Sequence, residues 1–595
     1  MKFSVIEILL NCCELTKTPI FIAPLHHCRH TSTMSKYQAV DQSDSNSERI
    51  HSGRSEGNGG QEGERLHQDN PEPIRESRVP ADDRLSSSDM ETQALLDPDD
   101  PIVSPLNLDR IKLLKYIQTV LVFVNLVLFF VLLFSDFFPI PGFNNRGKSF
   151  LQIDLVLICL LINGLNQASF VVPAYYERIG GYIVSGLLLI DLILVIAIPE
   201  TRQEQGFLGS FLILWTALTS LLNSLIDYWV EEAKHYQEIR YTGRVEKRKT
   251  VRELFIIFVK TIFELFILWV VWCISLTIWL HCFDIHEKPW GQLIPVNNNQ
   301  FRVHLACFGD VYDKKSDQPI VLVEGGQMTS SEVFQEWIEE LHHLDKVERY
   351  CIWDRPGYGF SDSAPPPQSI GIVVDYLSEA LESQGIEGPF AVVGFDIGGL
   401  YARMFASRHR AKIHSVLFVD AWPADLLKKW PFSGSGKKNE STKVFKHSLE
   451  VMDNITGIKL WLKGFISPLG IIPSFHWFFH PMKFSSKSRV FGRDMYYQSK
   501  YIRARCQEQL ISGILSYNEI READINELQV GVISSDFMIK KSLNWGKWQR
   551  ELTKLSSRTA EWVIAENSDH FIWRSSKGRK ELQQLLLRLI GEQEY

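Results

Sequence analysis

The sequence lacks an excess of positive charge, a disulfide scaffold and any zinc-site motif. Its formal net charge is −7 over 595 residues, which gives no support for nucleic-acid binding. Nine cysteines are too few for a disulfide framework in a chain of this length, and no Cys/His group has zinc-ligand spacing. The chain is also too long for one domain, so we expect a multidomain protein without a structural metal.

The amino-terminal region lacks a convincing signal-peptide core, because its apolar run from Val5 to Leu10 is short. Residues 35–108 are rich in Ser, Glu, Asp, Gln, Gly and Arg and poor in aromatic residues. Such a composition cannot bury enough apolar surface to offset chain entropy. We therefore predict a disordered cytosolic tail over residues 1–108. A mitochondrial presequence is the alternative for its first residues, although Glu7 and Glu14 argue against one.

Long apolar runs follow the polar tail. Five of them lie near residues 114–138, 150–172, 181–199, 207–229 and 254–281. Each is long enough to cross a hydrocarbon core of ~30 Å at about 1.5 Å per residue. The sequence therefore predicts a five-span membrane region over residues 109–285, with the lipid bilayer as its partner.

The loops between these runs differ in basic residues. The loop before the last run and the flank of the first run are rich in them: Arg110, Lys112, Lys115, Lys234, Arg240, Arg244, Lys247, Arg248, Lys249 and Arg252. The positive-inside rule places these segments in the cytosol, so that an odd number of spans leaves the rest of the chain lumenal. We expect a multi-pass protein of an endomembrane, the endoplasmic reticulum or the vacuole, with mitochondria as the alternative.

Ionisable residues inside membrane spans are costly and call for a partner. Lys260 lies four residues before Glu264, so we expect these two side chains to pair on one helix face. Asp191 lies near the middle of its run and is the residue to test if the membrane region transports a solute.

From about residue 295, short apolar runs alternate with helical stretches, which predicts a mostly parallel sheet flanked by helices. The apolar run 390–393 is followed by Gly394-Phe395-Asp396-Ile397-Gly398-Gly399. This is the strand–turn–helix pattern of a nucleophile elbow, with Asp where Ser is usual. A carboxylate there suits displacement at saturated carbon, which forms an alkyl ester on the enzyme.

Three further motifs occur in the order that such a fold requires. The run 319–323 ends in Glu324-Gly325-Gly326, where backbone N–H groups can face a cavity. The string Asp354-Arg355-Pro356-Gly357-Tyr358-Gly359-Phe360-Ser361-Asp362 follows the next predicted strand. A late strand, 563–565, leads to His570, a candidate base.

Together these motifs resemble the α/β-hydrolase superfamily over residues 295–592. The Asp elbow is similar to that of epoxide hydrolases and of the dehalogenases that share the fold. The complete arrangement, in which a multi-span half precedes this hydrolase, resembles a group of fungal integral-membrane proteins.

The resemblance implies the catalytic roles. Asp396 is the expected nucleophile, His570 the base that activates water, and the backbone N–H groups of Gly326 and Ile397 the oxyanion hole. It implies no metal and no organic cofactor.

A carboxylate must orient His570, and two candidates remain open. Asp536 follows the seventh predicted strand, the commonest position, and we favour it. Asp420 follows the sixth strand, where some dehalogenases keep this group. The other of the two is expected to cap a helix or a turn.

A long insertion, about residues 422–525, has the position of the family's cap. Its aromatic run, residues 460–479, is either the core of the cap or a membrane-facing mouth. Epoxide hydrolases protonate the opening ring with cap tyrosines, and the candidates here are Tyr496, Tyr497 and Tyr501.

One departure from the usual sequence pattern weakens the resemblance to dehalogenases and to epoxide hydrolases. Dehalogenases and epoxide hydrolases commonly place Trp directly after the nucleophile, whereas this chain has Ile397. We expect a membrane-anchored hydrolase that acts on an apolar or lipid-derived substrate, with epoxide hydrolysis as the leading reaction. The alternatives are a non-catalytic interaction module and a membrane transporter or scaffold with an accessory hydrolase domain. The sequence does not identify protein partners.

Overall fold

The computed structural model describes residues 100–591, except 246–248, 314–315, 328, 429–453, 482, 484 and 559–560. Residues 1–99 of the predicted disordered tail lie outside the described residues. Its last part contains two short 3-10 helices, η1 (Pro101–Val103) and η2 (Pro105–Asn107). Each begins with proline, whose fixed φ suits the first position of a helix.

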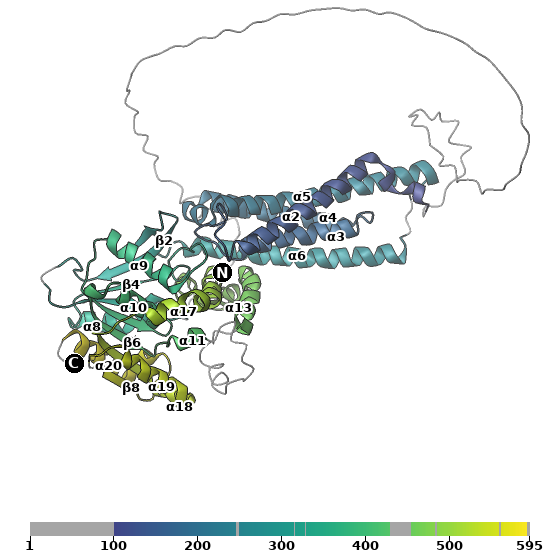
Figure 1. Ribbon diagram of the computed structural model, residues 1–595. Coiled ribbons are helices and arrows are strands. Elements are labelled where there is room, and N and C mark those ends of the chain that lie inside the picture. The colour runs from purple at the N-terminus through teal and green to yellow at the C-terminus, as the bar shows by residue number, and fades with distance from the viewer. Residues whose placement is uncertain are drawn as a thin grey trace, which may run out of the picture. The chain divides into compact units, whose positions relative to one another are not determined.

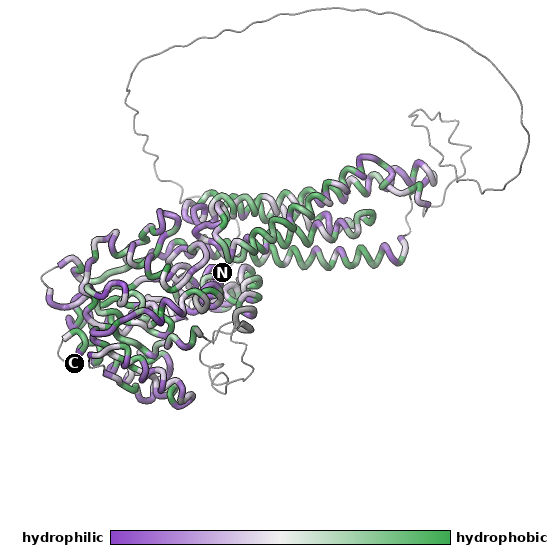
Figure 2. Tube along the Cα trace, in the orientation of Figure 1, coloured by the Kyte–Doolittle hydropathy of each residue, from purple (hydrophilic) through white to green (hydrophobic). Residues whose placement is uncertain are grey.

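Five long helices follow: α2 (Asp109–Phe134), α3 (Leu151–Ala168), α4 (Tyr175–Ala197), α5 (Pro199–Thr242) and α6 (Val251–Asp284). All five are long and apolar enough to cross a membrane. They run alongside one another in Figure 1, and apolar residues dominate them in Figure 2. Helix α5 is kinked at Gly206, whose φ of 61° is left-handed. Helix α6 begins with a capping box of Thr250 and Glu253.

The ion-pair partners of buried Lys260 differ from the predicted partner, Glu264. Its Nζ lies 2.6 Å from Glu177 Oε2 on α4 and 3.3 Å from Asp227 Oδ1 on α5. The expected partner, Glu264, instead packs its side chain against Gly180 of α4. Lys260 therefore joins three helices, which a pairing rule within one helix does not predict.

The part of the chain after α6 contains one eight-stranded sheet with the strand order β1-β2-β4-β3-β5-β6-β7-β8. Its strands are β1 (Gln292–Val296), β2 (Phe301–Phe308), β3 (Ile320–Glu324), β4 (Tyr350–Trp353), β5 (Phe390–Phe395), β6 (Ile413–Val419), β7 (Gln529–Ser535) and β8 (Glu561–Ala565). Strand β2 is antiparallel to both neighbours, and all pairs from β4 to β8 are parallel. This is the mostly parallel sheet that the alternating pattern predicts. A disulfide between Cys307 and Cys351 joins β2 to β4.

Alternate residues of the central strands enter two different cores, as the period of a strand requires. Leu322 and Val392 pack with α9 (Ile370–Ser383) and α10 (Gly398–Arg408) on one face of the sheet. Val323 and Val393 pack on the other face with α8 (Glu336–His343) and α20 (Ser576–Ile590). Because both faces are covered, the parallel strands can be apolar throughout.

A helical insertion between β6 and β7 forms the cap. Its elements are α11 (Asp425–Lys428), α13 (Asn454–Ile466), η4 (Ser467–Leu469), α14 (Ile471–Phe479), α15 (Ser486–Val490), η5 (Arg493–Tyr497), α16 (Ser499–Gln507), the π-helical η6 (Glu508–Ser512) and α17 (Gly513–Glu522). Two short helices, α18 (Asp536–Lys541) and α19 (Leu543–Leu552), follow β7.

The cap and the long apolar helices share one hydrophobic core. Cap residues Leu460, Tyr501 and Ile502 lie in the same buried cluster as Leu132 of α2 and Ile274 of α6. The cap is therefore packed onto the helical bundle and is not a free lid.

A buried ion pair reinforces this contact. Asp136, just after α2, lies 3.0 Å from Arg503 Nε of cap helix α16. Its carboxylate also lies 3.6 Å from Lys148 Nζ. All three side chains are at most 8% exposed, so Asp136 is the counter-charge for two buried cations.

We expect Asp136→Asn to destabilise the protein, because it leaves Arg503 and Lys148 buried without a carboxylate. Breaking a buried pair in this way typically costs about 3–5 kcal/mol. Thermal unfolding of the purified full chain measures the effect. In the control, Asp109→Asn, the pair with Lys112 is exposed and worth about 0–1 kcal/mol. Equal melting temperatures for the two variants would contradict the coupling.

Candidate active site

Asp396 lies at a sharp turn between β5 and α10. Its φ is 55°, a left-handed conformation that few residues other than glycine adopt. The turn is closed by its own backbone, since Gly399 N donates to Asp396 O at 3.2 Å and Trp422 N donates to the same oxygen at 2.9 Å. The strand–turn–helix pattern of the sequence therefore produces the expected elbow geometry.

The glycines around Asp396 are required by close contacts. A Cβ on Gly394 would lie 2.6 Å from Gly398 O, and a Cβ on Gly398 would lie 2.5 Å from Gly325 O. These distances are shorter than any that carbon and oxygen tolerate without a shift of the backbone. The missing side chains thus let α10 pack against the elbow and let the segment after β3 approach it.

His570 and Asp420 complete a chain of three side chains with Asp396. His570 Nδ1 lies 2.7 Å from Asp420 Oδ2, and its Nε2 lies 3.4 Å from Asp396 Oδ1. Within the part of the chain that the structure describes, neither His570 Nε2 nor Asp396 Oδ1 has a hydrogen-bond partner. All three side chains are at most 8% exposed. Three residues that are distant in sequence therefore meet at the carboxyl ends of parallel strands.

The orienting carboxylate is Asp420, which corrects the preference for Asp536. Asp420 Oδ1 also accepts from Trp545 Nε1 at 2.7 Å and from Ser535 N at 3.2 Å, so the carboxylate is fixed from three sides. Asp536 faces elsewhere.

Asp536 begins α18 and forms an ion pair with Lys540 at 2.6 Å. Its Oδ1 accepts from Ser568 N at 3.1 Å, two residues before His570. It therefore holds the loop that carries His570, which is the turn-capping role expected for the second Asp. The position directly after a strand could not distinguish Asp420 from Asp536, because both residues follow strands that end at the same edge of the sheet.

The backbone donor that reaches Asp396 is Gln327, one residue beyond the predicted Gly326. Gln327 N donates to Asp396 Oδ2 at 2.9 Å. Gly326 packs directly against the Phe395 ring and Asp396 Cβ. The Ile397 side chain is buried in the core beside α10, and its N–H remains a candidate from its position after the nucleophile.

Arg355 fixes the peptide that supplies this donor. Its Nη2 donates to Gly326 O at 2.8 Å, and its Nη1 donates to Gly325 O at 2.5 Å. The Gly326 carbonyl and the Gln327 N–H belong to one planar peptide and point in opposite directions. A guanidinium on the carbonyl side therefore aims the N–H at Asp396.

Two buried carboxylates hold the guanidinium in turn. Arg355 Nη1 lies 2.6 Å from Glu324 Oε1, and Arg355 Nε lies 2.9 Å from Glu508 Oε1 of the cap. The hydroxyls of Tyr358 and Tyr401 also donate to Glu508, at 2.6 and 3.0 Å. Burial raises the pKa of Glu324 to about 7, although Arg355 lowers it. Glu324 is thus part of a buried charge network with Arg355 and Glu508.

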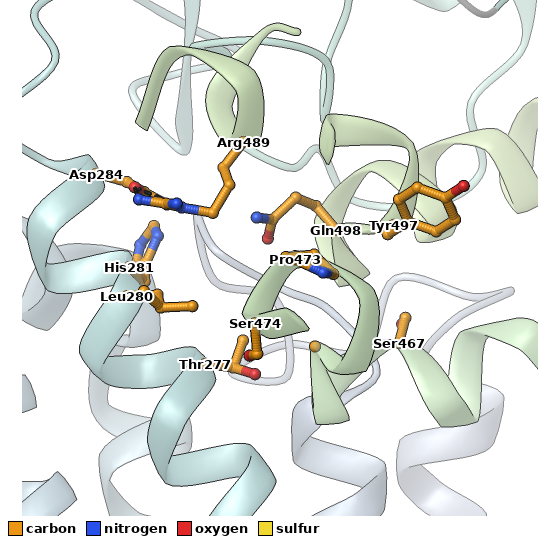
Figure 3. A pocket seen from close by; sticks show the side chains of 11 residues that line it. Thr277, Leu280, His281, Asp284, Ser467, Pro473, Ser474, Arg489, Tyr497 and Gln498 are labelled. Atoms are coloured by element: carbon orange, nitrogen blue, oxygen red, sulfur yellow. Dashed lines mark hydrogen bonds and ion pairs between the residues drawn. The ribbon is translucent and has the colours of Figure 1, made fainter. Parts of the chain in front are cut away.

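The three candidate cap tyrosines have different environments. The Tyr501 hydroxyl donates to Gln327 O at 2.6 Å, so this side chain reaches the oxyanion segment. Tyr496 is half-buried, and its ring centroid lies 5.7 Å from that of Tyr501. Tyr497 lines a different pocket, between α6 and the cap (Figure 3). Among the three, Tyr501 is therefore the one that contacts the site.

The two carboxylates around His570 control its charge. Burial by itself lowers the pKa of His570, but the neighbouring carboxylates of Asp396 and Asp420 raise it to about 10. The resting site therefore holds an imidazolium between two carboxylates. Neutralisation of Asp396 removes one of the two raising groups and favours the neutral imidazole.

A second buried group has residue types that bind metals: His304, Glu332 and Asp354. His304 Nδ1 lies 2.9 Å from Asp354 Oδ2 and 3.3 Å from Glu332 Oε1, and its Nε2 lies 2.5 Å from Trp290 O. Burial alone lowers the pKa of His304, but the two carboxylates raise it to about 10. An imidazolium with both nitrogens bonded accounts for this cluster without a metal.

Sequence reasoning missed several residues that shape the site. Arg355 and Tyr358 belong to the string 354–362, which was recognised without a role for either side chain. Gln327 follows the glycine pair directly, so a search one residue further would have found it. Glu508 and Trp545 have no local sequence signal.

Comparison with known proteins gives two matching family models. Residues 64–307 match a region of unknown function, DUF2417, and residues 318–459 match the alpha/beta hydrolase fold. The second match and the observed sheet confirm the predicted fold class of apolar helices followed by an α/β-hydrolase domain.

Relatives match along most of their length. An uncharacterized vacuolar membrane protein of Saccharomyces cerevisiae is 30% identical over 572 residues, which cover 80% of this chain and 87% of that protein. A Schizosaccharomyces pombe protein is 28% identical over 506 residues and is covered to 89%. Among solved structures, an esterase from Exiguobacterium antarcticum is similar at 14% identity and a TM-score of 0.36, over 50% of this chain and 99% of that one.

The raised pKa of His570 predicts a pH-dependent contribution to stability. The group binds its proton more tightly when folded, so its contribution is complete below pH 6.5 and is lost as the pH rises to about 10. We expect the melting-temperature difference between the wild type and His570→Gln to shrink across this range. His343→Gln, at an exposed position, is the control and should follow the wild type. A constant difference for His570→Gln would contradict the paired imidazolium.

Proposed function

Because this chain belongs to the family of the Saccharomyces cerevisiae vacuolar membrane protein, we propose that it is a membrane-anchored hydrolase of an endomembrane such as the vacuole. Its reaction proceeds through an Asp396 alkyl ester, and epoxide hydrolysis is the leading candidate. The alpha/beta hydrolase match over residues 318–459 supports the general class. The narrower chemistry rests on the residues at the elbow.

One observation carries the proposal: the two oxygens of Asp396 have different environments. Oδ2 accepts from Gln327 N at 2.9 Å, whereas Oδ1 has no hydrogen-bond partner among the described residues and lies 3.4 Å from His570 Nε2. A nucleophile needs one free oxygen to attack and one held oxygen that can carry charge later. A carboxylate that served only as a structural anchor would have both oxygens bonded.

In the first step, Asp396 Oδ1 attacks a ring carbon of the epoxide, and the carbon–oxygen bond of the ring breaks. The released oxygen takes a proton from a cap hydroxyl. Tyr501 is the candidate donor, because its hydroxyl lies 2.6 Å from Gln327 O beside the oxyanion segment. The products of this step are an ester on Asp396 and an alcohol on the substrate.

In the second step, the ester carries no charge, so His570 loses one of the two carboxylates that raise its pKa, and its proton passes to the phenolate that the first step left on Tyr501. The neutral imidazole removes a proton from water, and the hydroxide attacks Cγ of Asp396. The oxyanion forms on Oδ2, where the N–H groups of Gln327 and Ile397 stabilise it. Release of the diol restores the carboxylate, which keeps one oxygen from water.

Two features support an apolar, lipid-derived substrate and an endomembrane location. The cap shares a hydrophobic core with the long apolar helices, so the catalytic domain lies beside the bilayer that they would cross. The Cys307–Cys351 disulfide suits an oxidising compartment, in agreement with a lumenal catalytic domain.

A single turnover in heavy-oxygen water tests the proposed chemistry, with an epoxidised long-chain fatty acid as the probe and enzyme in excess. The first diol should contain no solvent oxygen, because its new oxygen comes from Asp396. Solvent oxygen should then be found in the peptide that contains Asp396. Asp396→Asn serves as the inactive control. A first diol that carries solvent oxygen would show direct attack by water and contradict the ester.

A further inference from the structure

Cap helix α14 (Ile471–Phe479) exposes apolar side chains over most of its surface. Phe478 is 72% exposed and Phe475 is 57% exposed. The full set of exposed large apolar residues on this helix is Ile471, Ile472, Phe475, Trp477, Phe478 and Phe479. Leu462 and Ile466, one turn apart on α13, are also exposed. This is a larger apolar surface than a water-facing helix of nine residues normally carries.

The inner side of α14 is more polar than its outer side. His476 Nδ1 lies 2.8 Å from Asp494 Oδ1, and Asp494 is fully buried. Ser474 lines the pocket between α14 and α6. A helix in water buries its aromatic residues and exposes its polar ones. The reversed distribution indicates that the outer side of α14 faces a medium other than water.

Helix α14 packs on the carboxyl-terminal end of α6. Figure 3 shows Pro473 and Ser474 facing Thr277 and Leu280 of α6. Gly470, directly before α14, packs so closely on Thr277 that a Cβ would clash with its hydroxyl. Nearby, Arg489 Nη2 lies 2.6 Å from Asp284 Oδ1, with both side chains buried. These contacts fix the position of α14 along α6.

That position corresponds to the edge of the hydrocarbon core. Exposed large apolar side chains follow one another along α6 from Val251 to Trp272, which spans about 32 Å at about 1.5 Å per residue, and Phe283 is exposed near the end of the helix. This length is close to the ~30 Å of a hydrocarbon core. Trp269 and Trp272 lie at its end, where aromatic side chains concentrate in membrane proteins. Thr277 lies about 8 Å further along the helix, which is interfacial depth.

We propose that α14 is an interfacial membrane helix, with its exposed aromatic side embedded in the leaflet at which α6 ends. The molecules that contact this exposed side are phospholipids. Helix α14 packs on α6 just beyond the exposed apolar stretch that ends at Trp272, and exposed Lys487 of the next helix, α15, suits the headgroup layer. The inference rests on the membrane-spanning role of α6 and not on the chemistry of Asp396. It resolves the two interpretations of the aromatic run in favour of the membrane-facing one for residues 471–479.

Site-specific photocrosslinking of the full chain in phosphatidylcholine vesicles tests this proposal. The probe is Phe478→p-benzoylphenylalanine, at an exposed position where the larger ring needs no repacking. The lipid-facing reference is Phe266→p-benzoylphenylalanine on α6, which is 49% exposed. The water-facing reference is Tyr312→p-benzoylphenylalanine, 61% exposed in the loop before β3, at the sheet edge opposite the cap. Unchanged melting temperatures verify the fold of each variant.

After irradiation, mass spectrometry should find a phosphatidylcholine adduct on the peptide containing position 478. Its yield should lie within about twofold of that at position 266 and at least about tenfold above that at position 312, as expected for an embedded helix. A crosslink from position 478 to residues 1–99 or 429–453, or to a second copy of the chain, would identify a protein occupant and overturn the proposal. A lipid yield no higher than at position 312 would also overturn it.

Discussion

The left-handed backbone of Asp396 is the constraint on which the site depends. At a φ of 55°, the carboxylate leaves β5 at the edge of the sheet and faces His570, while α10 packs close behind it. The turn is tight enough that the segment after β3 also approaches Asp396 and donates Gln327 N–H to one carboxylate oxygen. Arg355 orients that donor from the other side of the peptide, so Asp396 and the Gln327 N–H are positioned together.

The membrane region contributes more than an anchor. The cap that would cover the substrate is buried against α2 and α6, and Asp136 neutralises cations from both parts. Glu508, in the same cap, binds the Arg355 that orients the oxyanion peptide. The helical bundle, the cap and the catalytic edge are therefore connected through packed side chains. This arrangement makes a large swing of the cap costly.

Local sequence patterns predicted the features that depend on local physics. Glycine placement predicted the elbow at Asp396. The end of a late strand predicted the position of His570, and hydropathy predicted the long apolar helices. Partners chosen by tertiary packing were not predictable in this way. Both Asp420 and Asp536 follow strands that end at one edge, and only the loop path of His570 decides between them. Lys260 was expected to pair along its own helix but reaches α4 and α5 instead. Glu508 lies in a cap helix without any sequence signal.

The central claim is that Asp396 forms a covalent ester and that His570 is required to hydrolyse it. The most direct measurement is peptide mass spectrometry of His570→Gln protein isolated from cells that make its natural substrate. The account predicts that the peptide containing Asp396 carries the mass of a bound substrate and that the added mass disappears in the His570→Gln, Asp396→Asn double variant. An unmodified Asp396 peptide in the single variant, or the same adduct in the double variant, would contradict it.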